Sequence, residues 1–245
     1  MFNGFKGVLY RELSVFRTRA KKQILASSLS PLLYLIAFGW SFGKGVSVDG
    51  LPYITFLIPG LITMSSLNQS YGIAQELNIT RFYFHVFDEF LIAPISHTEI
   101  VLGEAAYGMF KGLLSTILIF VYALLFGVKL IFNPIFFLAI LLHTFLFAAL
   151  GITIAMIVRD HGTQAMVNTF VITPMIFLSG TFFPVDKLPY IFKVLVYALP
   201  LTYSTKVIRA SLTGGEINPV FVSLIVMFAA LFFYTALWAV RRVEA

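Results

Sequence analysis

Long apolar runs without charged residues are the feature that most limits what this chain can fold into. With Asp, Glu, Lys and Arg as the only breaks, such runs occupy residues 23–43, 50–75, 112–128, 130–158, 161–185 and 217–240. A helix that crosses the hydrocarbon layer needs about 20 apolar residues. The third run is short, but it reaches that length if the helix begins near Leu102 and Lys111 extends toward the lipid headgroups. At that level Glu76 and Glu104 are candidates for ion pairs with Arg81 and Lys111. We therefore predict an all-α membrane protein with six transmembrane helices.

The composition agrees with lipid as the solvent for much of the chain. Only 11% of the residues are charged and 59% are hydrophobic, whereas soluble domains carry roughly 25% charged residues. A net charge of +6 is compatible with nucleic acid, but the basic residues lie beside the apolar runs, as is typical of proteins that contact anionic lipid. We expect membrane lipid as a partner and no nucleic acid. Cysteine is absent, which excludes disulfide and thiolate chemistry.

The distribution of Lys and Arg predicts an orientation. With the N-terminus inside, the segments between the predicted helices place eleven of the 17 basic residues on the inner side. The positive-inside rule then favours cytoplasmic N- and C-termini. Four of the six outer basic residues fall in one segment: Lys187, Lys193, Lys206 and Arg209.

That outer segment, residues 181–213, has the pattern of two short helices that enter the membrane and turn back. In "FLSGTFFPVDKLP" (177–189), Gly180 and Pro184 are suited to end a helix. The following "YIFKVLVYAL" is half the length of a crossing helix, and Pro200 separates it from another short helical piece. A seventh crossing helix here would instead bury two lysines, each at roughly 2.5–3.5 kcal/mol at the centre of a lone helix. We therefore predict a re-entrant helical pair before the last span.

The first 22 residues predict an amphipathic helix on the membrane surface. Apolar residues recur there at helical spacing, opposite basic ones: Phe2, Phe5, Leu9, Leu13 and Phe16. The alternative is a solvated basic tail before the first crossing helix. No boundary indicates a second domain, so residues 1–245 form a single transmembrane domain.

The inner loop over residues 78–102 is too aromatic for a passive connector. Pro94 ends a helix, and Ser96 with Glu99 has the spacing of a capping box for the next one. We predict a short helix near 80–92 that docks on another protein. The alternative is an interfacial helix that faces only lipid.

Four motifs in this order resemble the signatures of ABC-2 type transporter permeases, the membrane subunits of type-2 ABC exporters. They are "FLIPGLITMSS" (56–66), "FDEFLIAPISHTEIVLGE" (87–104), "FLSGTFFPVDKLP" (177–189) and "LPLTYSTKVIRASLTGG" (199–215). They resemble both the polysaccharide and lipo-oligosaccharide export branch and the drug-efflux branch.

The resemblance implies a multi-pass protein of a bacterial or archaeal cytoplasmic (inner) membrane, paired with a second permease copy and with two cytoplasmic ABC ATPase subunits. ATP and Mg would bind those partners, and this chain would carry no cofactor, no metal and no enzymatic activity of its own. The loop at 78–102 would be the ATPase-coupling loop, with contacts from Tyr83, His85, Phe87, Asp88, Glu89 and Phe90. The re-entrant pair would form the outer gate, with Gly180, Phe183, Pro184 and Pro200 at its turns.

Polar residues inside the apolar runs are candidates for lining the translocation path. They are Thr63, Ser66, Asn68, Ser70, Asn168 and Thr173. Each of them is equally suited to a hydrogen bond between helices. The expected cargo is an amphipathic envelope glycan or a lipid-linked saccharide, with hydrophobic drugs as the alternative.

Two rival functions stay open on the sequence. An ion-coupled secondary transporter needs ionisable groups near mid-membrane, and His143 is the central candidate for a proton site, or else a neutral packing residue. A membrane-bound transferase would use His85 and Asp88. No GxxxxGK[ST] motif is present, so we expect no ATP site on this chain.

Overall fold

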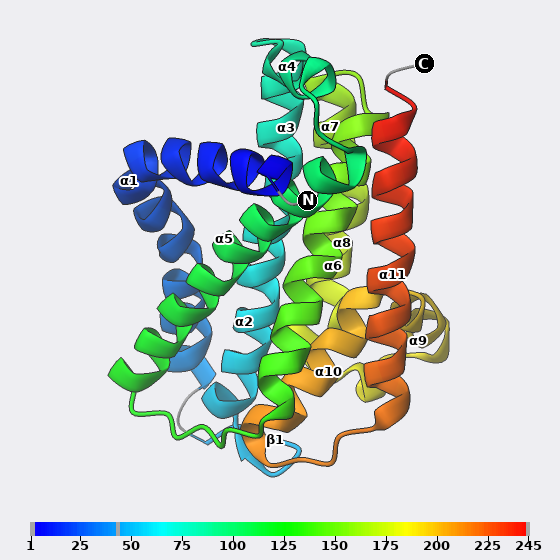
Figure 1. The fold of residues 1–245 in the computed structure, drawn as a ribbon. Coiled ribbons are helices and arrows are strands. Elements are labelled where there is room, and N and C mark those ends of the chain that lie inside the picture. Colours follow the sequence, from blue (N-terminus) through cyan, green and yellow to red (C-terminus); the bar gives the residue numbers. More distant parts are fainter. Residues whose placement is uncertain (1–2, 43–44, 244–245) are drawn as a thin grey trace.

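The chain forms a bundle of helices that mostly run along one direction (Figure 1). The computed structural model describes residues 3–42 and 45–243, without the side chains of residues 40–42, Asp88 and Leu91. The first half contains α1 (Asn3–Phe42), β1 (Ser47–Val48), β2 (Leu51–Pro52), α2 (Tyr53–Tyr71), α3 (Ile73–Phe82), α4 (Val86–Ile92) and α5 (His97–Leu125). The second half contains α6 (Ile135–Ile157), α7 (His161–Val167), η1 (Asn168–Ile172), α8 (Thr173–Ile176), η2 (Phe177–Thr181), η3 (Val185–Lys187), α9 (Tyr190–Tyr197), α10 (Pro200–Thr213) and α11 (Pro219–Arg241).

Among the described residues, three single helices are long and apolar enough to cross a membrane: α5, α6 and α11. The pair α9 and α10 passes the same test only when joined, and its two helices meet at 90°. The structure thus confirms an all-α membrane protein with at least three candidate spans. The full six-span layout stays a prediction.

Helix α2 forms the centre of the bundle. It contacts α1, α5, α6 and α10, and residues along its whole length are buried, among them Leu57, Leu61 and Leu67, each 0% exposed. Helix α11 packs against α6 on the other side. Because α2 is surrounded by protein, it can carry polar residues that a lipid-facing helix could not.

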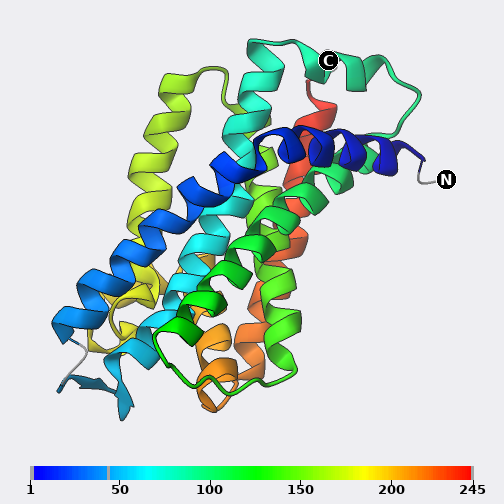
Figure 2. The same ribbon diagram turned by 90° about the vertical axis from the view of Figure 1, so that its left-hand side faces the viewer.

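Helix α1 continues without a break from the predicted surface segment into the predicted first span. Its first part lies across one end of the bundle, and the helix then turns along α5 (Figures 1 and 2). Val8 is buried, and the ring of Phe16 meets that of Phe110 edge-on at 5.2 Å. The apolar face of this segment therefore contacts α5, which argues against a solvated tail. Phe2 lies outside the described residues.

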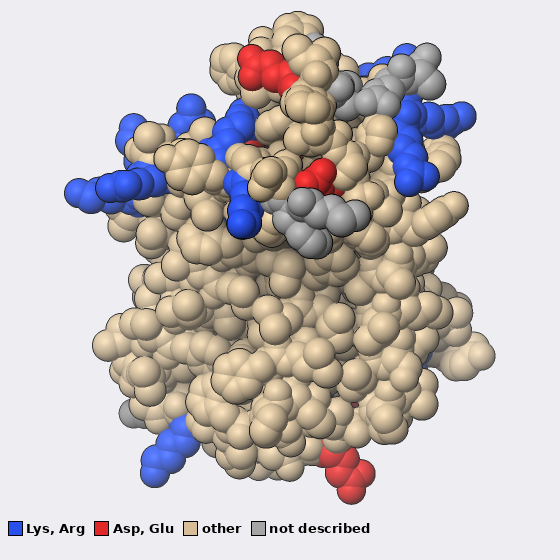
Figure 3. Space-filling model, in the orientation of Figure 1, with Lys and Arg blue, Asp and Glu red and all other residues tan. Residues whose placement is uncertain are grey.

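The two ends of the bundle differ in charge. The start of α1, helix α4 and the end of α11 lie at one end, here named the α4 end (Figures 1 and 2). The antiparallel strands β1 and β2 and the loop between α5 and α6 lie at the other, named the hairpin end. Figure 3 shows blue side chains mainly near the α4 end and an uncharged band between the ends. This arrangement agrees with the predicted orientation.

One sequence prediction about Lys111 is wrong. Helix α5 begins at His97, well before Leu102, so Lys111 lies inside the helix rather than near its end. Its side chain is only 6% exposed, and its Nζ lies 2.7 Å from a carboxylate oxygen of Glu76. Lys111 therefore points into the protein toward α3, because an ion partner is available there.

Candidate functional site

The aromatic loop at the α4 end consists of two helices instead of one. Helix α3 ends at Phe82, and α4 begins only at Val86. Between them His85 adopts the left-handed conformation with φ of 53°, which an α-helix cannot contain. The predicted continuous helix over 80–92 is therefore wrong at residues 83–85.

The predicted capping box at the end of this loop is confirmed. The Ser96 side chain accepts a hydrogen bond from the Glu99 amide at 3.3 Å, and Glu99 Oε2 accepts one from the Ser96 amide at 3.0 Å. The other Glu99 oxygen accepts a bond from the Gly4 amide at 3.1 Å. One carboxylate therefore joins the start of α5 to the start of α1.

Some of the candidate ATPase contacts are exposed, and others are buried against the bundle. Tyr83 and Phe84 are 63% and 67% exposed, and His85 and Glu89 are also exposed. Phe87 is 1% exposed, and its ring meets that of Phe90 edge-on at 6.0 Å.

The side chain of Asp88 lies outside the described residues.

Contacts with other elements hold the loop on the bundle. The Tyr83 ring stacks on His161 at 5.2 Å, and the Arg11 guanidinium lies 5.2 Å from the Phe90 ring.

At the hairpin end, a helical segment breaks where the sequence predicts it. Residues 161–181 are helical, with π-helical turns at η1 and η2, and the helix opens at Ser179 and Gly180. Gly180 has φ of +84°, a conformation that favours glycine. A Cβ on Gly60 of α2 would lie 2.3 Å from the Thr181 carbonyl oxygen. Two of the quoted motifs thus meet, and the glycine in "PGL" permits this close approach.

Arg209 of α10 connects this break to α2. Its Nη2 donates to the Gly180 carbonyl at 2.7 Å, and its Nε donates to the Phe56 carbonyl at 3.2 Å. The guanidinium also lies 3.8 Å from the Phe56 ring centroid. Nearby, Tyr53 donates to the Phe182 carbonyl at 3.0 Å. No local pattern around Arg209 predicts this role, since its acceptors are backbone carbonyls far away in the chain.

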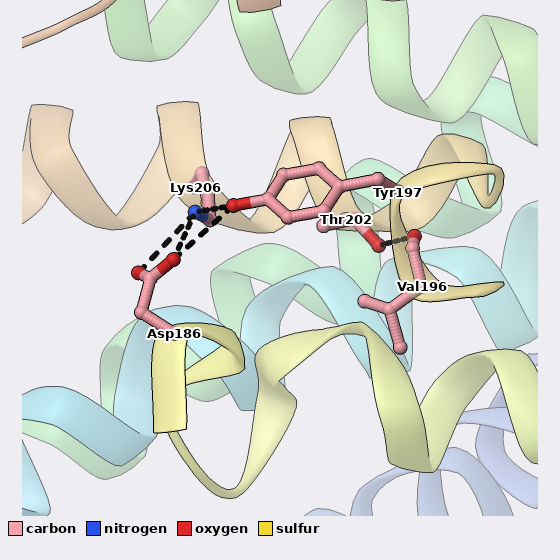
Figure 4. Close-up of polar contacts among 5 residues, drawn as sticks. All are labelled: Asp186, Val196, Tyr197, Thr202 and Lys206. Atoms are coloured by element: carbon pink, nitrogen blue, oxygen red, sulfur yellow. Dashed lines mark hydrogen bonds and ion pairs between the residues drawn. The ribbon is translucent and has the colours of Figure 1, made fainter. Parts of the chain in front are cut away.

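Helices α9 and α10 lie in the half of the bundle nearest the hairpin (Figure 1). Pro200, which is buried, is the first residue of α10. Figure 4 shows Lys206 between Asp186 and Tyr197: its Nζ lies 3.3 Å from the carboxylate and 2.7 Å from the phenol oxygen. Thr202 donates to the Val196 carbonyl at 2.6 Å. These contacts fix η3, α9 and α10 relative to one another.

The turns of this region are partly buried. Phe183 and Pro184 follow the helix break and are half-buried. A cavity of about 370 Å³ opens beside α10, and its lining includes Asp49, Asp186 and Lys206.

The polar residues proposed for the path divide into two groups. Thr63, Ser66 and Ser70 are each 0% exposed within the chain. Thr63 Oγ1 lies 3.2 Å from Thr205 Oγ1 of α10, and Ser66 donates to the Ile62 carbonyl at 2.6 Å within its own helix. These three side chains therefore lie in the interior of the chain.

The second group lies nearer the surface. Asn68 and Thr173 are exposed, and Asn168 is half-buried. The Asn168 side-chain oxygen accepts a hydrogen bond from Tyr71 at 2.8 Å, and Thr173 donates to the Asn168 carbonyl at 2.9 Å. Asn168 and Thr173 lie at the two ends of the π-helical turn η1, a kind of distortion often found at functional sites.

His143 is fully buried between α6 and α2. Its Nε2 lies 3.1 Å from the Thr63 carbonyl, and its ring meets Phe147 edge-on at 4.9 Å. These contacts are those of a packing residue. Among the residues described, no group of three or more His, Cys, Asp or Glu side chains is placed to hold a metal ion.

Comparison with known proteins gives one family and several relatives. The family model described as "ABC-2 type transporter" matches residues 3–213. Nodulation protein J of Sinorhizobium fredii is 28% identical over 95% of this chain and 90% of its own. Nodulation protein J of Rhizobium meliloti is 31% identical over 84% and 80%. The inner membrane transport permease YadH of Escherichia coli K12 is 27% identical over 96% and 93%.

Proposed function

This chain belongs to the ABC-2 type transporter family as one of its membrane permeases, and from that premise we propose a specific working unit. Two six-span permease copies associate with two cytoplasmic ABC ATPase subunits, which bind ATP and Mg and drive export. This chain supplies the path and no ATPase chemistry. The α4 end faces the cytoplasm, with both termini on that side of the inner membrane.

The exposed aromatic surface around α4 is the observation that carries this proposal. Tyr83, Phe84 and Ile92 are 63%, 67% and 85% exposed at the end of the bundle that holds most of the basic residues. Large apolar side chains grouped at a charged, water-facing end indicate a protein contact. The position fits docking on an ATPase subunit, because Glu89 is also exposed in this loop while Phe87 is buried and anchors α4 on the bundle.

A second copy would cover the exposed apolar face of α1 and of the segment 161–181. Leu25 and Leu29 of α1 are 70% and 56% exposed, and Met166 and Phe170 are 62% and 74% exposed. Asn68, Asn168 and Thr173 are the path candidates that remain accessible there, whereas the buried Thr63, Ser66 and Ser70 support α2. The re-entrant pair would close the outer mouth, with the break at Gly180 as its turning point.

The cargo we propose is an amphipathic envelope glycan or a lipid-linked saccharide. The support is the resemblance of the four motifs to that export branch. Efflux of hydrophobic drugs is the alternative within the same family. A glycan exporter should hydrolyse ATP faster when the glycan is added, and a drug exporter when a hydrophobic drug is added.

The first test is purification of the tagged chain from native membranes in mild detergent, with identification of co-eluting proteins and an ATPase assay. We expect a stoichiometric soluble ATPase. Phe84→Ser and Glu89→Lys should release it or uncouple hydrolysis from transport. Phe132→Ser, which alters an aromatic residue that is 55% exposed at the hairpin end, is the matched control.

Two outcomes would count against the proposal. If both Phe84→Ser and Glu89→Lys kept a normally coupled ATPase, the docking site would lie elsewhere. If no nucleotide-binding partner appeared and an ion gradient drove transport in liposomes, the exporter assignment itself would fail.

The second copy is tested by disulfide cross-linking, because the chain has no cysteine of its own. Phe170→Cys should give a covalent dimer on oxidation in membranes. Tyr234→Cys, at a position on α11 that is 69% exposed, should stay monomeric. The reverse pattern would place the dimer contact on α11.

A further inference from the structure

A group of charged side chains is buried near the α4 end, where α1, α3 and α5 meet. Glu12 is 7% exposed, Glu104 is 2% exposed and Lys111 is 6% exposed. Glu12, Glu76 and Glu104 line one small cavity of about 10 Å³. Neither the coupling surface nor the outer region uses this cluster.

The charges in this cluster do not balance. The titratable groups that face one another are Arg11 and Glu12 from α1, Glu76 from α3, and Glu104, Tyr107 and Lys111 from α5. Lys111 pairs with Glu76, and Arg11 pairs with Glu12. Glu104 is the third carboxyl against two cations, and its Oε1 has no hydrogen-bond partner in the described part of the chain.

A buried carboxylate without a partner is strongly destabilising, and such groups are neutralised by taking up a proton. A bound hydrated cation is the other means of neutralisation. The cavity of about 10 Å³ has room for about one water molecule at most, and none for a hydrated ion. Burial also raises the pKa of the Glu12 carboxyl, while the adjacent Arg11 lowers it in part.

We propose that this cluster is a proton-binding site in which Glu12 and Glu104 share one proton. The proton allows the first part of α1 to lie against α5. Because Arg11 also lies 5.2 Å from the Phe90 ring, the same site supports α4 from below. This inference concerns the chain itself and goes beyond its proposed function.

The sign of the pH dependence follows from linkage. Burial raises the pKa of Glu12, so the folded chain holds this proton more tightly than the unfolded chain, in which a glutamate has a pKa of about 4.3. Its contribution to stability is therefore fully present below that value and is lost as the pH rises toward the raised pKa of the folded state. At alkaline pH the first part of α1 should detach from α5 more often.

Infrared spectroscopy of the protein in lipid nanodiscs tests the proposal, with 13C-labelled glutamate to separate Glu from Asp. At neutral pH we expect a band from one protonated glutamic acid. Glu104→Gln should remove it. Glu76→Gln should remove it as well, because two carboxylates would then face two cations. Glu216→Gln, at an exposed glutamate of the hairpin end, is the matched control and should leave the band unchanged.

Hydrogen exchange of residues 3–22, corrected for intrinsic rates, gives a second readout. Protection in the wild-type chain should fall as the pH rises, and Glu104→Gln should flatten that dependence. Absence of the band in the wild-type chain, or its survival in both Glu104→Gln and Glu12→Gln, would overturn the proposal. If the protonated-acid band were absent and the stability depended on sodium or potassium, the site would bind a metal cation instead of a proton.

Discussion

Replacing Arg209 by Met should loosen the region around the helix break at Gly180 without unfolding the bundle. The guanidinium makes two well-placed hydrogen bonds, to the Gly180 carbonyl at 2.7 Å and to the Phe56 carbonyl at 3.2 Å. It also lies 3.8 Å from the Phe56 ring centroid. Methionine keeps most of the apolar volume but removes the donors and the charge.

The magnitude follows from these contacts. Hydrogen bonds to charged groups contribute about 1.5–3 kcal/mol each, and a cation–π contact contributes about 0.5–2 kcal/mol. The lower part of these ranges lowers the free energy of local opening by about 4 kcal/mol. The region should then open roughly a thousandfold more often. Arg209→Lys should lose part of this, because an ammonium group cannot stack or donate as a planar fork.

Hydrogen exchange resolved by peptide is the assay, because it reports local opening separately for each segment. Peptides from 177–189 and 200–215 should exchange much faster in Arg209→Met, whereas peptides from α5 and α6 should not change. Lys187→Met alters an exposed cation of the same region and should have no effect. Wild-type protection in Arg209→Met, or an equal loss in α5 and α6, would refute the reasoning.

Two further predictions concern contacts inside the bundle, each with thermal unfolding in detergent as the measurement. Gly60→Ala should destabilise the fold by about 1–3 kcal/mol, because the new Cβ would lie 2.3 Å from the Thr181 carbonyl oxygen. The control is Gly7→Ala, where a Cβ meets nothing within 4 Å and the effect should be neutral or stabilising. Equal effects of the two changes would contradict the close approach of Gly60 to Thr181. Lys111→Met should lower the free energy of unfolding by about 1–3 kcal/mol. The double variant with Glu76→Gln should lose less than the sum of the two single variants. Simple additivity would show that the ion pair contributes nothing.

Local signals in the sequence were sufficient for the boundaries of several elements. The capping box of Ser96 and Glu99 and the helix break at Gly180 appear in the structure where the sequence predicts them. Two short helices also meet near Pro200, as predicted: α9 ends at Tyr197, and α10 begins at Pro200 itself. Caps, glycines and prolines act within about one helical turn, so neighbouring residues contain the necessary information.

The two errors concern effects that no short window contains. The break at His85, which has the left-handed conformation, interrupts a stretch that was predicted as one helix, and the neighbouring Tyr83 ring stacks on His161, far along the chain. Lys111 was expected to reach the headgroups, whereas the structure turns it inward and selects Glu76, 35 residues earlier in the chain, from the acidic residues named as possible ion partners. A lysine in an apolar helix has the same local pattern whether it extends to lipid or pairs within the protein.

By itself, the sequence determined that lipid is the solvent, that the chain is helical, and where several of the helices start, stop and turn. These properties follow from apolar content and from short-range backbone chemistry. The tertiary structure alone decided the surroundings of each polar group: Thr63 beside Thr205, Arg209 on the carbonyls of α2 and η2, and Glu104 beside Glu12. A polar residue inside an apolar run must find a partner or a proton, and only the folded arrangement of distant helices determines which one it finds.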